Sequence, residues 1–342
     1  MKALVFYGDN QLKYVDVPAP VYGENEVLVK VKAVGICGSD VAGYLGKTGR
    51  RTPPMIMGHE FAGVVEQVGA SVTNVKVGDS VVVFPYTSCA ACESCAKGMT
   101  SACEHKRFFG VFAVNGGMAE YVSAGSDLLY PLPAGTELKH GAMAEPLSVA
   151  SRCVDKAAIT PGSTLTIIGA GTIGLMCLLL AKLRQPRTIA VLDISDERLE
   201  LARSLGADLI INPGKESPSE VMAAHFPSGG TSAVIEAVGV ESTLSQAVAL
   251  AERGGRISVV GMSQRMIAVD LYEVIGKELQ INGSFQYDRK QFENVLACLP
   301  ALKDDLDRVI SHVEPLAKGV EMYERLAKTE PGMMKVILTD QA

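Results

Sequence analysis

The stretch Thr164-Leu-Thr-Ile-Ile-Gly-Ala-Gly-Thr-Ile-Gly174 decides the fold of this chain. Its first five residues are apolar or β-branched and predict a buried strand, and a helix is predicted over 172–183. Gly169 allows a tight turn, Gly171 lets the backbone approach a pyrophosphate, and Gly174 lets the helix pack on the strand. Because a helix N-terminus favours negative charge, the stretch predicts a dinucleotide-binding loop.

Strand-like and helix-like segments alternate after this loop, which predicts a parallel sheet with helices on both faces. The predicted strands are Leu165 to Ile168, Thr188 to Leu192, Asp208 to Ile211, Ser232 to Val238, Arg256 to Val260 and 279–283. The predicted helices are Thr172 to Leu183, Asp196 to Leu205 and Thr243 to Ala251.

The N-terminal part of the chain has a different rhythm, with short strands closed by glycine-containing turns, as in 27–32, 62–68 and 80–84. The tail from about 288 has mixed character and ends in the apolar run Met334-Lys-Val-Ile-Leu338. A chain of 342 residues is expected to form two domains. We therefore predict one domain over 1–150 and 287–342, with a second, over 151–286, inserted into it.

Composition excludes several classes of function. The net charge is -6, with 20% charged and 48% apolar residues, so no basic surface for nucleic acid or an anionic membrane is expected. Residues 157–181 carry no charge, but Pro161 and several glycines interrupt them, which argues against a membrane span. The first residues hold no apolar leader, so a cytoplasmic location is expected.

Asp193 bears on the choice of cofactor. It lies 19 residues after Gly174, at the end of the next predicted strand, where a carboxylate accepts hydrogen bonds from a ribose 2′-hydroxyl. A 2′-phosphate would be repelled there, so NAD is favoured over NADP. Arg198 leaves NADP open, because it could lie over the adenine or reach a phosphate.

Four of the eight cysteines form one loop, Cys89-x2-Cys92-x2-Cys95-x7-Cys103. Four thiolates satisfy tetrahedral zinc with no open position, which predicts a structural zinc site in a reducing compartment. An iron–sulfur cluster and redox-active thiols are the alternatives. Cys153, Cys177 and Cys298 are interpreted as packing residues.

Two further segments are Gly35-Ile-Cys37-Gly-Ser39-Asp40 and Gly58-His59-Glu60. Spacing alone does not make them a site, since a lone cysteine is usually a small buried residue. Taken with the four-cysteine loop, Ala144-Glu145-Pro-Leu-Ser-Val149 and the glycine-rich stretch, in this order, they resemble the zinc-dependent medium-chain alcohol dehydrogenases. The resemblance covers the full length and is strongest to the polyol branch, which includes sorbitol and galactitol-1-phosphate dehydrogenases.

The resemblance implies an α/β fold, with a GroES-like β-barrel catalytic domain, a Rossmann domain and the active site in the cleft between them. It implies a catalytic zinc held by Cys37 and His59, with Glu60 and Glu145 as further or exchanging ligands. Ser39 matches the family's proton-relay hydroxyl, although a turn serine is the alternative. Asp40 is expected to orient His59.

The resemblance also implies residues that contact the small molecules. The expected cofactor contacts are Gly169, Gly171, Thr172, Ile173, Gly174, Asp193, Arg198, Val260, Gly261, Met262, Ser284 and Phe285, and the expected substrate contacts are Tyr44 and Gln286.

Two departures from the family pattern limit the choice of substrate. Ala42 stands where many relatives have a histidine that accepts the proton, and Gln286 replaces the arginine of sorbitol dehydrogenase. Lys47, Arg50 and Arg51 could clamp a phosphorylated substrate, or could simply form a solvated basic loop.

The expected reaction is oxidation of a secondary hydroxyl of a sugar alcohol to a ketose, by hydride transfer from a zinc-bound alkoxide to the nicotinamide of NAD. A polyol phosphate such as galactitol 1-phosphate, or threonine, is an alternative substrate, and a zinc-stabilised NAD-binding protein without activity is the non-enzyme alternative. The resemblance further implies two zinc ions per chain and a homo-oligomer, with a tetramer favoured over a dimer.

Overall fold

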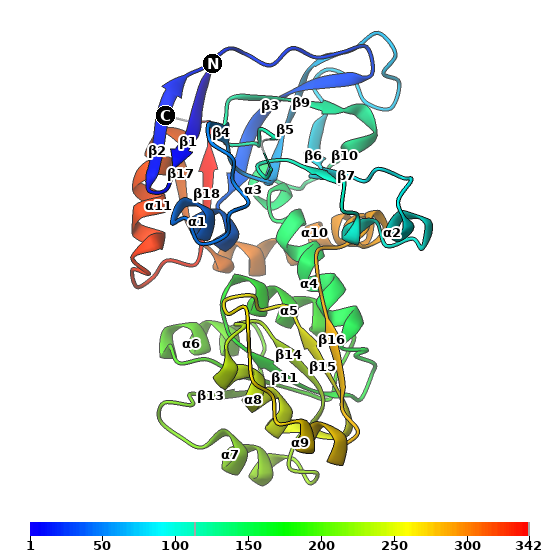
Figure 1. The fold of residues 1–342 in the computed structure, drawn as a ribbon, viewed down its shortest axis with the longest axis vertical. Coiled ribbons are helices and arrows are strands. Elements are labelled where there is room, and N and C mark those ends of the chain that lie inside the picture. The colour runs from blue at the N-terminus through cyan, green and yellow to red at the C-terminus, as the bar shows by residue number, and fades with distance from the viewer. Residues whose placement is uncertain (113, 341–342) are drawn as a thin grey trace. The chain divides into compact units, whose positions relative to one another are not determined.

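The computed structural model describes residues 1–112 and 114–340. The chain divides into two compact units (Figure 1). Unit 1 comprises Met1–Glu145 with Asp288–Ala342, and unit 2 comprises Pro146–Tyr287. Unit 1 is therefore discontinuous in sequence, because unit 2 lies between its two segments.

Unit 2 is built on a six-stranded sheet with the order β13-β12-β11-β14-β15-β16, in which every pair of neighbours is parallel. The order corresponds to the doubly wound arrangement of dinucleotide-binding domains, with β11 as the first strand. The strands are β11 (Thr164–Ile168), β12 (Thr188–Leu192), β13 (Leu209–Ile211), β14 (Thr231–Glu236), β15 (Ala251–Val259) and β16 (Gln280–Gly283).

Helices connect these strands, as parallel pairing requires. The connecting helices are α5 (Thr172–Lys182), α6 (Asp196–Ser204), α7 (Pro218–His225), α8 (Glu241–Leu250) and α9 (Leu271–Gly276), and α4 (Ala144–Lys156) precedes the first strand. All five residues of β11 are buried, and α5 is buried from Gly174 to Ala181, so the glycine-rich turn joins two elements of the core. A cluster of buried apolar residues, which includes Phe226, Val234, Val248 and Ile257, joins α8 to the sheet.

Unit 1 contains a seven-stranded, mainly antiparallel sheet with the order β10-β6-β5-β3-β18-β17, and β9 also pairs with β3. These strands are β3 (Glu26–Gly35), β5 (Glu60–Val68), β6 (Ser80–Val83), β9 (Tyr121–Gly125), β10 (Leu129–Pro131), β17 (Ile310–Pro315) and β18 (Lys335–Thr339). Because β18 pairs with β3, the second segment of unit 1 completes a sheet that the first begins.

Smaller elements complete unit 1. Its other strands are β1 (Lys2–Gly8), β2 (Gln11–Asp16), β4 (Met55–Ile56), β7 (Tyr86–Thr87) and β8 (Arg107–Phe108). Its helices are α1 (Gly38–Tyr44), α2 (Glu93–Ala96), α3 (Leu138–Gly141), α10 (Arg289–Val309) and α11 (Gly319–Ala327), with short 3-10 turns at Thr100–Ala102, Ser126–Leu128 and Leu316–Lys318.

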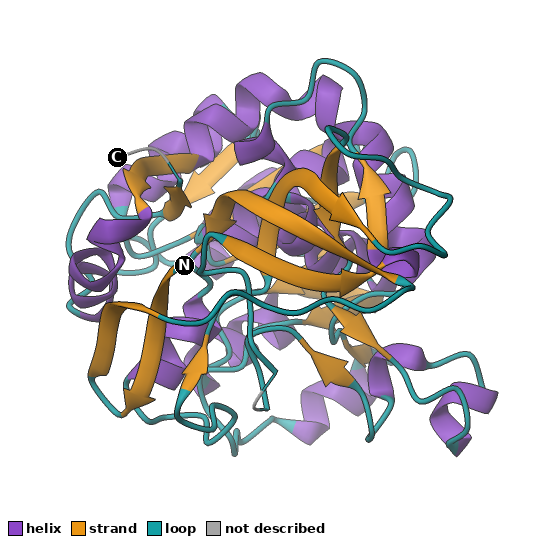
Figure 2. Ribbon diagram, turned by 90° about the horizontal axis from the view of Figure 1, so that it is seen from above, coloured by secondary structure: helices purple, strands orange, loops and turns teal. Residues whose placement is uncertain are grey.

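The predicted fold class is confirmed, and Figure 2 shows the mixture of helices and strands. Most predicted strands and helices of unit 2 lie within a few residues of their predicted positions, but β15 begins at Ala251, five residues before the predicted Arg256. Helix α10 lies where only mixed character is predicted, and it begins with a capping box in which Asp288 and Gln291 each accept from the other's backbone N–H.

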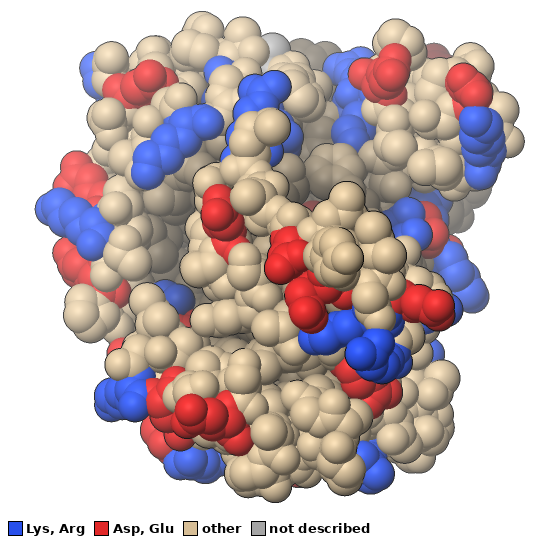
Figure 3. Space-filling view, turned by 60° about the horizontal axis from the view of Figure 1, so that its bottom comes forward, with Lys and Arg blue, Asp and Glu red and all other residues tan. Residues whose placement is uncertain are grey.

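Two features are not expected from the composition: a basic surface for nucleic acid or an anionic membrane, and a membrane-spanning helix. On the face that Figure 3 shows, acidic and basic side chains are interspersed and no continuous basic patch is seen. Within the described residues, no helix combines the length and the apolar character that crossing a membrane requires.

Candidate functional site

Three potential metal ligands converge where β3 ends and β5 begins. Gly35, the last residue of β3, pairs with Glu60, the first residue of β5, and Cys37 follows β3 after one residue. One ligand atom each from Cys37, His59 and Glu60 lies within 4.8 Å of the others. His59 and Glu60 are buried and Cys37 is partly buried, so strand pairing brings the two sequence motifs together.

The backbone around Cys37 fixes the direction of its thiol. Cys37 is the N-cap of α1, where its Sγ accepts a hydrogen bond from Ser39 N at 3.4 Å. Asp40 Oδ2 accepts from Cys37 N at 3.3 Å, which completes a capping box. Ser39 itself is exposed in the first turn of the helix, as a hydroxyl that passes a proton to water would need to be.

Asp40 links the histidine to a buried arginine. Asp40 Oδ1 lies 2.6 Å from Arg51 Nη2 and 3.5 Å from His59 Nδ1. Burial alone would raise the pKa of Asp40, but the positive charges of His59 and Arg51 outweigh it and hold this pKa well below the usual range. Burial would likewise lower the pKa of His59, but Asp40 and the Cys37 thiol raise it well above its ordinary value. Asp40 and the Cys37 thiol therefore favour a positive charge at His59.

Glu60 is paired with Lys335, which comes from the distant strand β18. Lys335 Nζ donates to Glu60 Oε2 and to the carbonyl oxygen of Ile36, the latter at 3.2 Å. Both side chains are almost completely buried. Burying a charge is unfavourable unless it is paired, so each of the two charges requires the other.

The donor set fits a zinc ion that performs chemistry. Thiolate sulfur, imidazole nitrogen and carboxylate oxygen are the three ligand types of zinc, and three protein ligands leave a fourth position for a substrate. The buried His59 Nδ1 faces Asp40 Oδ1 at 3.5 Å, and a carboxylate is the partner that a ligating histidine ordinarily has. Glu145, buried in the first turn of α4, stays a predicted ligand.

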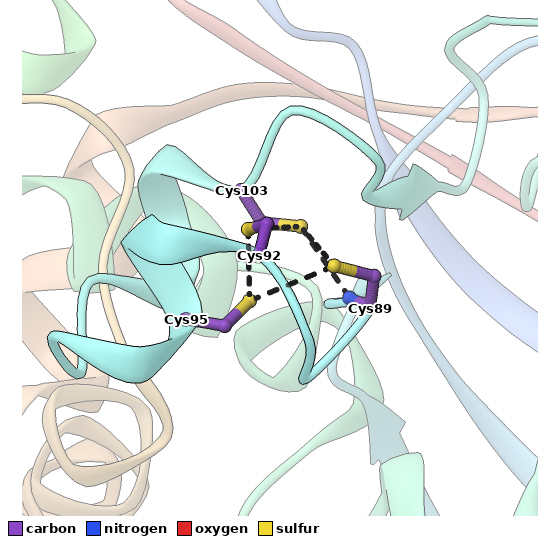
Figure 4. Close-up of side chains that lie close together, drawn as sticks. All are labelled: Cys89, Cys92, Cys95 and Cys103. Carbon is purple, nitrogen blue, oxygen red and sulfur yellow. Dashed lines mark hydrogen bonds between the residues drawn. The ribbon is translucent and has the colours of Figure 1, made fainter.

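The four cysteines of the loop form a second donor set, and their sulfurs point toward one another (Figure 4). The Sγ–Sγ distances are 3.5 Å for Cys92–Cys95, 3.8 Å for Cys92–Cys103, 3.5 Å for Cys89–Cys103 and 4.0 Å for Cys89–Cys95. A tetrahedron with Zn–S bonds of about 2.3 Å has S–S edges of about 3.8 Å. The cysteines therefore fit a closed tetrahedral site.

The acidities of these thiols also favour a cation. Backbone N–H groups of Ala91 and Cys92 lower the pKa of Cys89 to about 6. Desolvation and the neighbouring thiol of Cys92 raise the pKa of Cys95 to about 11. Because metal binding requires thiolates, a divalent cation at the centre would stabilise the charged form of all four cysteines, including Cys95.

The glycine-rich loop of unit 2 has the close contacts that its sequence predicts. A Cβ added to Gly174 would lie 1.7 Å from the carbonyl oxygen of Gly169, so helix and strand approach too closely for a side chain. A Cβ at Gly171 would meet nothing within 4 Å, which leaves room for a ligand above the loop. Thr172 and Ile173 are partly buried in the first turn of α5.

Asp193 follows β12 and holds this loop. Its Oδ2 accepts from Ala170 N at 2.7 Å and its Oδ1 from Ser195 N at 2.9 Å. Each oxygen keeps a lone pair, so the carboxylate can still accept a ribose hydroxyl. The main chain of Arg198 donates to Ser195 Oγ, and its side chain is partly buried.

The other predicted cofactor and substrate residues lie in several environments. Gly261 packs against the backbone of Gly239, where a Cβ would meet the Gly239 nitrogen at 2.1 Å. Val260 is partly buried, Met262 and Phe285 are exposed, and Ser284 is buried with an unpartnered Oγ. Gln286 has a left-handed backbone, with φ of 53°. Tyr44 is buried with its ring edge-on to Tyr323. Their contacts with ligands stay predictions.

Both interpretations of the basic residues Lys47, Arg50 and Arg51 are wrong for Arg51. Lys47 and Arg50 are exposed, but Arg51 is buried against Asp40 and belongs neither to a solvated loop nor to a clamp that reaches out for phosphate. Lys335 has no place among the predicted site residues, although a lysine inside the apolar run 334–338 is a signal, because a buried charge needs a partner.

Comparison with known proteins identifies the class. Residues 23–134 match the alcohol dehydrogenase GroES-like domain, and residues 172–301 match the zinc-binding dehydrogenase domain. The chain is 35% identical to sorbitol dehydrogenase of Bacillus subtilis, over 84% of this chain and 82% of that protein. It is 35% identical to L-idonate 5-dehydrogenase of Vitis vinifera, over 89% of this chain and 85% of that protein.

Solved structures agree. Galactitol-1-phosphate dehydrogenase of Escherichia coli superposes with a TM-score of 0.92 at 28% identity, covering 99% of this chain and 100% of that one. A zinc-binding dehydrogenase of Sinorhizobium meliloti bound to NADP has a TM-score of 0.91 at 29% identity, with coverage of 99% and 98%. An alcohol dehydrogenase of Escherichia coli CFT073 complexed with NADH has a TM-score of 0.91 at 31% identity, with coverage of 99% and 99%.

The chain therefore belongs to the zinc-dependent medium-chain alcohol dehydrogenase family, in its polyol branch. It is an oxidoreductase, and the non-enzyme alternative is set aside.

Proposed function

We propose that this enzyme oxidises a secondary hydroxyl of a sugar alcohol to a ketose, with NAD as the hydride acceptor. The convergence of Cys37, His59 and Glu60 on one small volume is the observation that carries the proposal. These residues would hold the catalytic zinc, with Glu145 as a further or exchanging ligand. The named dehydrogenases of sorbitol and idonate among its relatives support a polyol as the substrate.

The cofactors supply the reaction's two chemical requirements when bound: zinc lowers the pKa of a substrate hydroxyl, and nicotinamide accepts the hydride. The residues of the chain position these groups. Asp40 contacts His59 Nδ1 and so orients the imidazole ring, and Ser39 has an exposed hydroxyl close to Cys37 that would carry a proton to water. Since Ala42 cannot accept that proton, its exit would end at solvent.

NAD is proposed over NADP because Asp193 places a negative charge beside the predicted ribose position. Its hydrogen bonds to Ala170 N and Ser195 N fix the carboxylate there. We expect a much lower KM for NAD than for NADP in the wild type and a narrower difference in Asp193→Ala. A wild-type preference for NADP would contradict this assignment and point to Arg198.

The function is tested by metal analysis together with a substrate panel. We expect two zinc ions per chain, one of them at the four cysteines, and loss of turnover with loss of one zinc in Cys37→Ser. The panel measures NADH absorbance with free and phosphorylated polyols. One zinc per chain with unchanged activity in Cys37→Ser would remove the catalytic site from the proposal.

A polyol phosphate is the second candidate substrate. The close superposition with galactitol-1-phosphate dehydrogenase and the exposed Lys47 and Arg50 favour it. Faster turnover of phosphorylated than of free polyols, reduced by Arg50→Met, would select this candidate over the first.

A further inference from the structure

Lys335 is a buried cation in direct contact with a predicted metal ligand. It is 2% exposed at the start of β18, and its Nζ donates to Glu60 Oε2 and to the Ile36 carbonyl oxygen. Strand β18 pairs with β3, and β3 pairs with β5, whose first residue is Glu60. Strand register therefore places the ammonium group beside the ligand cluster.

The space for this contact is built into the sheet. Gly35 lies opposite Glu60, and a Cβ added there would lie 2.2 Å from Glu60 Oε2 and 3.0 Å from Lys335 Cε. Any side chain at position 35 would displace the ion pair. The lysine and the carboxylate thus occupy a place that the missing side chain leaves free.

The charges around the site are balanced in pairs. Arg51 neutralises Asp40, and Lys335 neutralises Glu60. Of the three converging ligands, only the Cys37 thiolate has no cation paired with it, so these three ligands would leave a bound zinc ion much of its positive charge. An ion in this state stabilises negative charge on a substrate better than one that is fully neutralised.

We propose that Lys335 is a positioning residue that competes with the catalytic metal for Glu60 and so keeps this carboxylate an exchangeable ligand. The inference rests on the proposed function, because it requires a metal at Cys37, His59 and Glu60. Without the ammonium group, Glu60 would give its whole charge to the metal. The metal would then be held more tightly and would be a weaker Lewis acid.

The test uses the whole enzyme with zinc left at the four cysteines and cobalt(II) loaded into the catalytic site. In Lys335→Met we expect release of cobalt to a chelator to slow by about tenfold, the scale on which groups behind the ligands act on metal affinity. We also expect the visible cobalt bands to change, because Glu60 becomes a full ligand. Lys335→Arg keeps the charge and is the matched control, with bands like those of the wild type.

A second pair of variants keeps the test decisive if Lys335→Met folds poorly. Removing both partners of a buried ion pair is far less harmful than removing one. Glu60→Gln and Glu60→Gln/Lys335→Met should have the same visible cobalt bands, because neither variant has a carboxylate for the lysine to compete for. The double variant should release cobalt more slowly only to the extent that the direct repulsion between the ammonium group and cobalt is lost. Different bands in this pair, or wild-type bands and release in Lys335→Met, would overturn the inference. Failure of the wild type to take up cobalt would instead contradict the proposed function.

Discussion

The residues that surround the candidate metal site matter through their charges as much as through their contacts. Asp40 and Glu60 are completely or almost completely buried. Asp40 is paired with Arg51 and also faces His59, and Glu60 is paired with Lys335. Removing one member of such a pair leaves the other charge buried and unpaired, which is more harmful than never having had the pair.

Arg51 allows a direct test of this asymmetry. We expect Arg51→Met to lower the free energy of unfolding by about 3 kcal/mol, because Asp40 stays buried without its main partner. Chemical denaturation monitored by circular dichroism measures the change. Arg50→Met is the matched control: its side chain is exposed, and its substitution should change stability by about 0.5 kcal/mol or less. Equal effects of the two substitutions would mean that the Asp40 pair contributes nothing specific.

Two glycines of the glycine-rich loop are expected to differ in role, since Gly174 is needed for folding and Gly171 for cofactor binding. Gly174→Ala should destabilise the enzyme by about 3 kcal/mol, since its Cβ would meet the Gly169 carbonyl oxygen at 1.7 Å. Gly171→Ala should leave the melting temperature nearly unchanged, because its φ is -73° and no atom lies within 4 Å of the added Cβ. It should nevertheless raise the Kd for NAD by about tenfold or more, as the methyl group stands where the backbone approaches a pyrophosphate. Calorimetric unfolding and binding titration measure the two effects, and wild-type affinity in Gly171→Ala would contradict the placement of the cofactor.

Family resemblance predicts some of these residues and not others. The ligand candidates Cys37, His59 and Glu60 stand in two short motifs that do not define a site by spacing alone, and the resemblance to the family implies their role. Arg51 and Lys335 act through partners that only the folded sheet supplies, since Lys335 reaches Glu60 through two strand pairings. A single sequence shows a lysine in an apolar run but does not show which carboxylate it meets.

Helices and strands whose formation depends on neighbouring residues in the sequence are the ones that the sequence predicts best. The turn from β11 to α5 depends on residues within one short stretch, and it lies where the glycine pattern predicts. Strand β15 begins five residues before the predicted start because residues 251–255, which include two glycines and carry no apolar alternation, extend it. The helix α10 depends on a capping box and on seven buried apolar residues, while Pro300 inside it conceals the helical pattern.

The four-cysteine loop is the element whose order depends most on a metal. Its only regular structure is the four-residue α2 and one turn of 3-10 helix, and α2 buries no residue. We expect Cys95→Ser to lower the melting temperature and remove one zinc per chain, while kcat per folded enzyme changes much less. Unfolding curves, metal analysis and activity corrected for folded fraction measure the three quantities. Selective loss of kcat at an unchanged melting temperature would mean that the loop acts in the chemistry.

For the whole molecule, the two kinds of site fall in different units. The Cys37, His59 and Glu60 cluster and the four-cysteine loop belong to unit 1, and the glycine-rich loop belongs to unit 2. Stripping both metals with a chelator should therefore speed amide hydrogen exchange in 1–145 and 288–340 and leave β11 to β16 nearly unchanged. NAD should protect residues near 169–174 in the stripped protein. Exchange that rises equally in both units would show that their stabilities are coupled.

The discontinuity of unit 1 has a consequence for biosynthesis. Strand β3 emerges from the ribosome early, but its neighbour β18 is translated only after all of residues 146–287. Unit 2, continuous in sequence, can begin to fold while unit 1 still lacks the strand that lies between β3 and β17. Glu60 is therefore synthesised well before Lys335. A metal ion that bound before β18 was translated would bind Glu60 without competition from the Lys335 ammonium group. The order of translation therefore means that the negative charge of Glu60 is neutralised only at the end of synthesis, when Lys335 has been added.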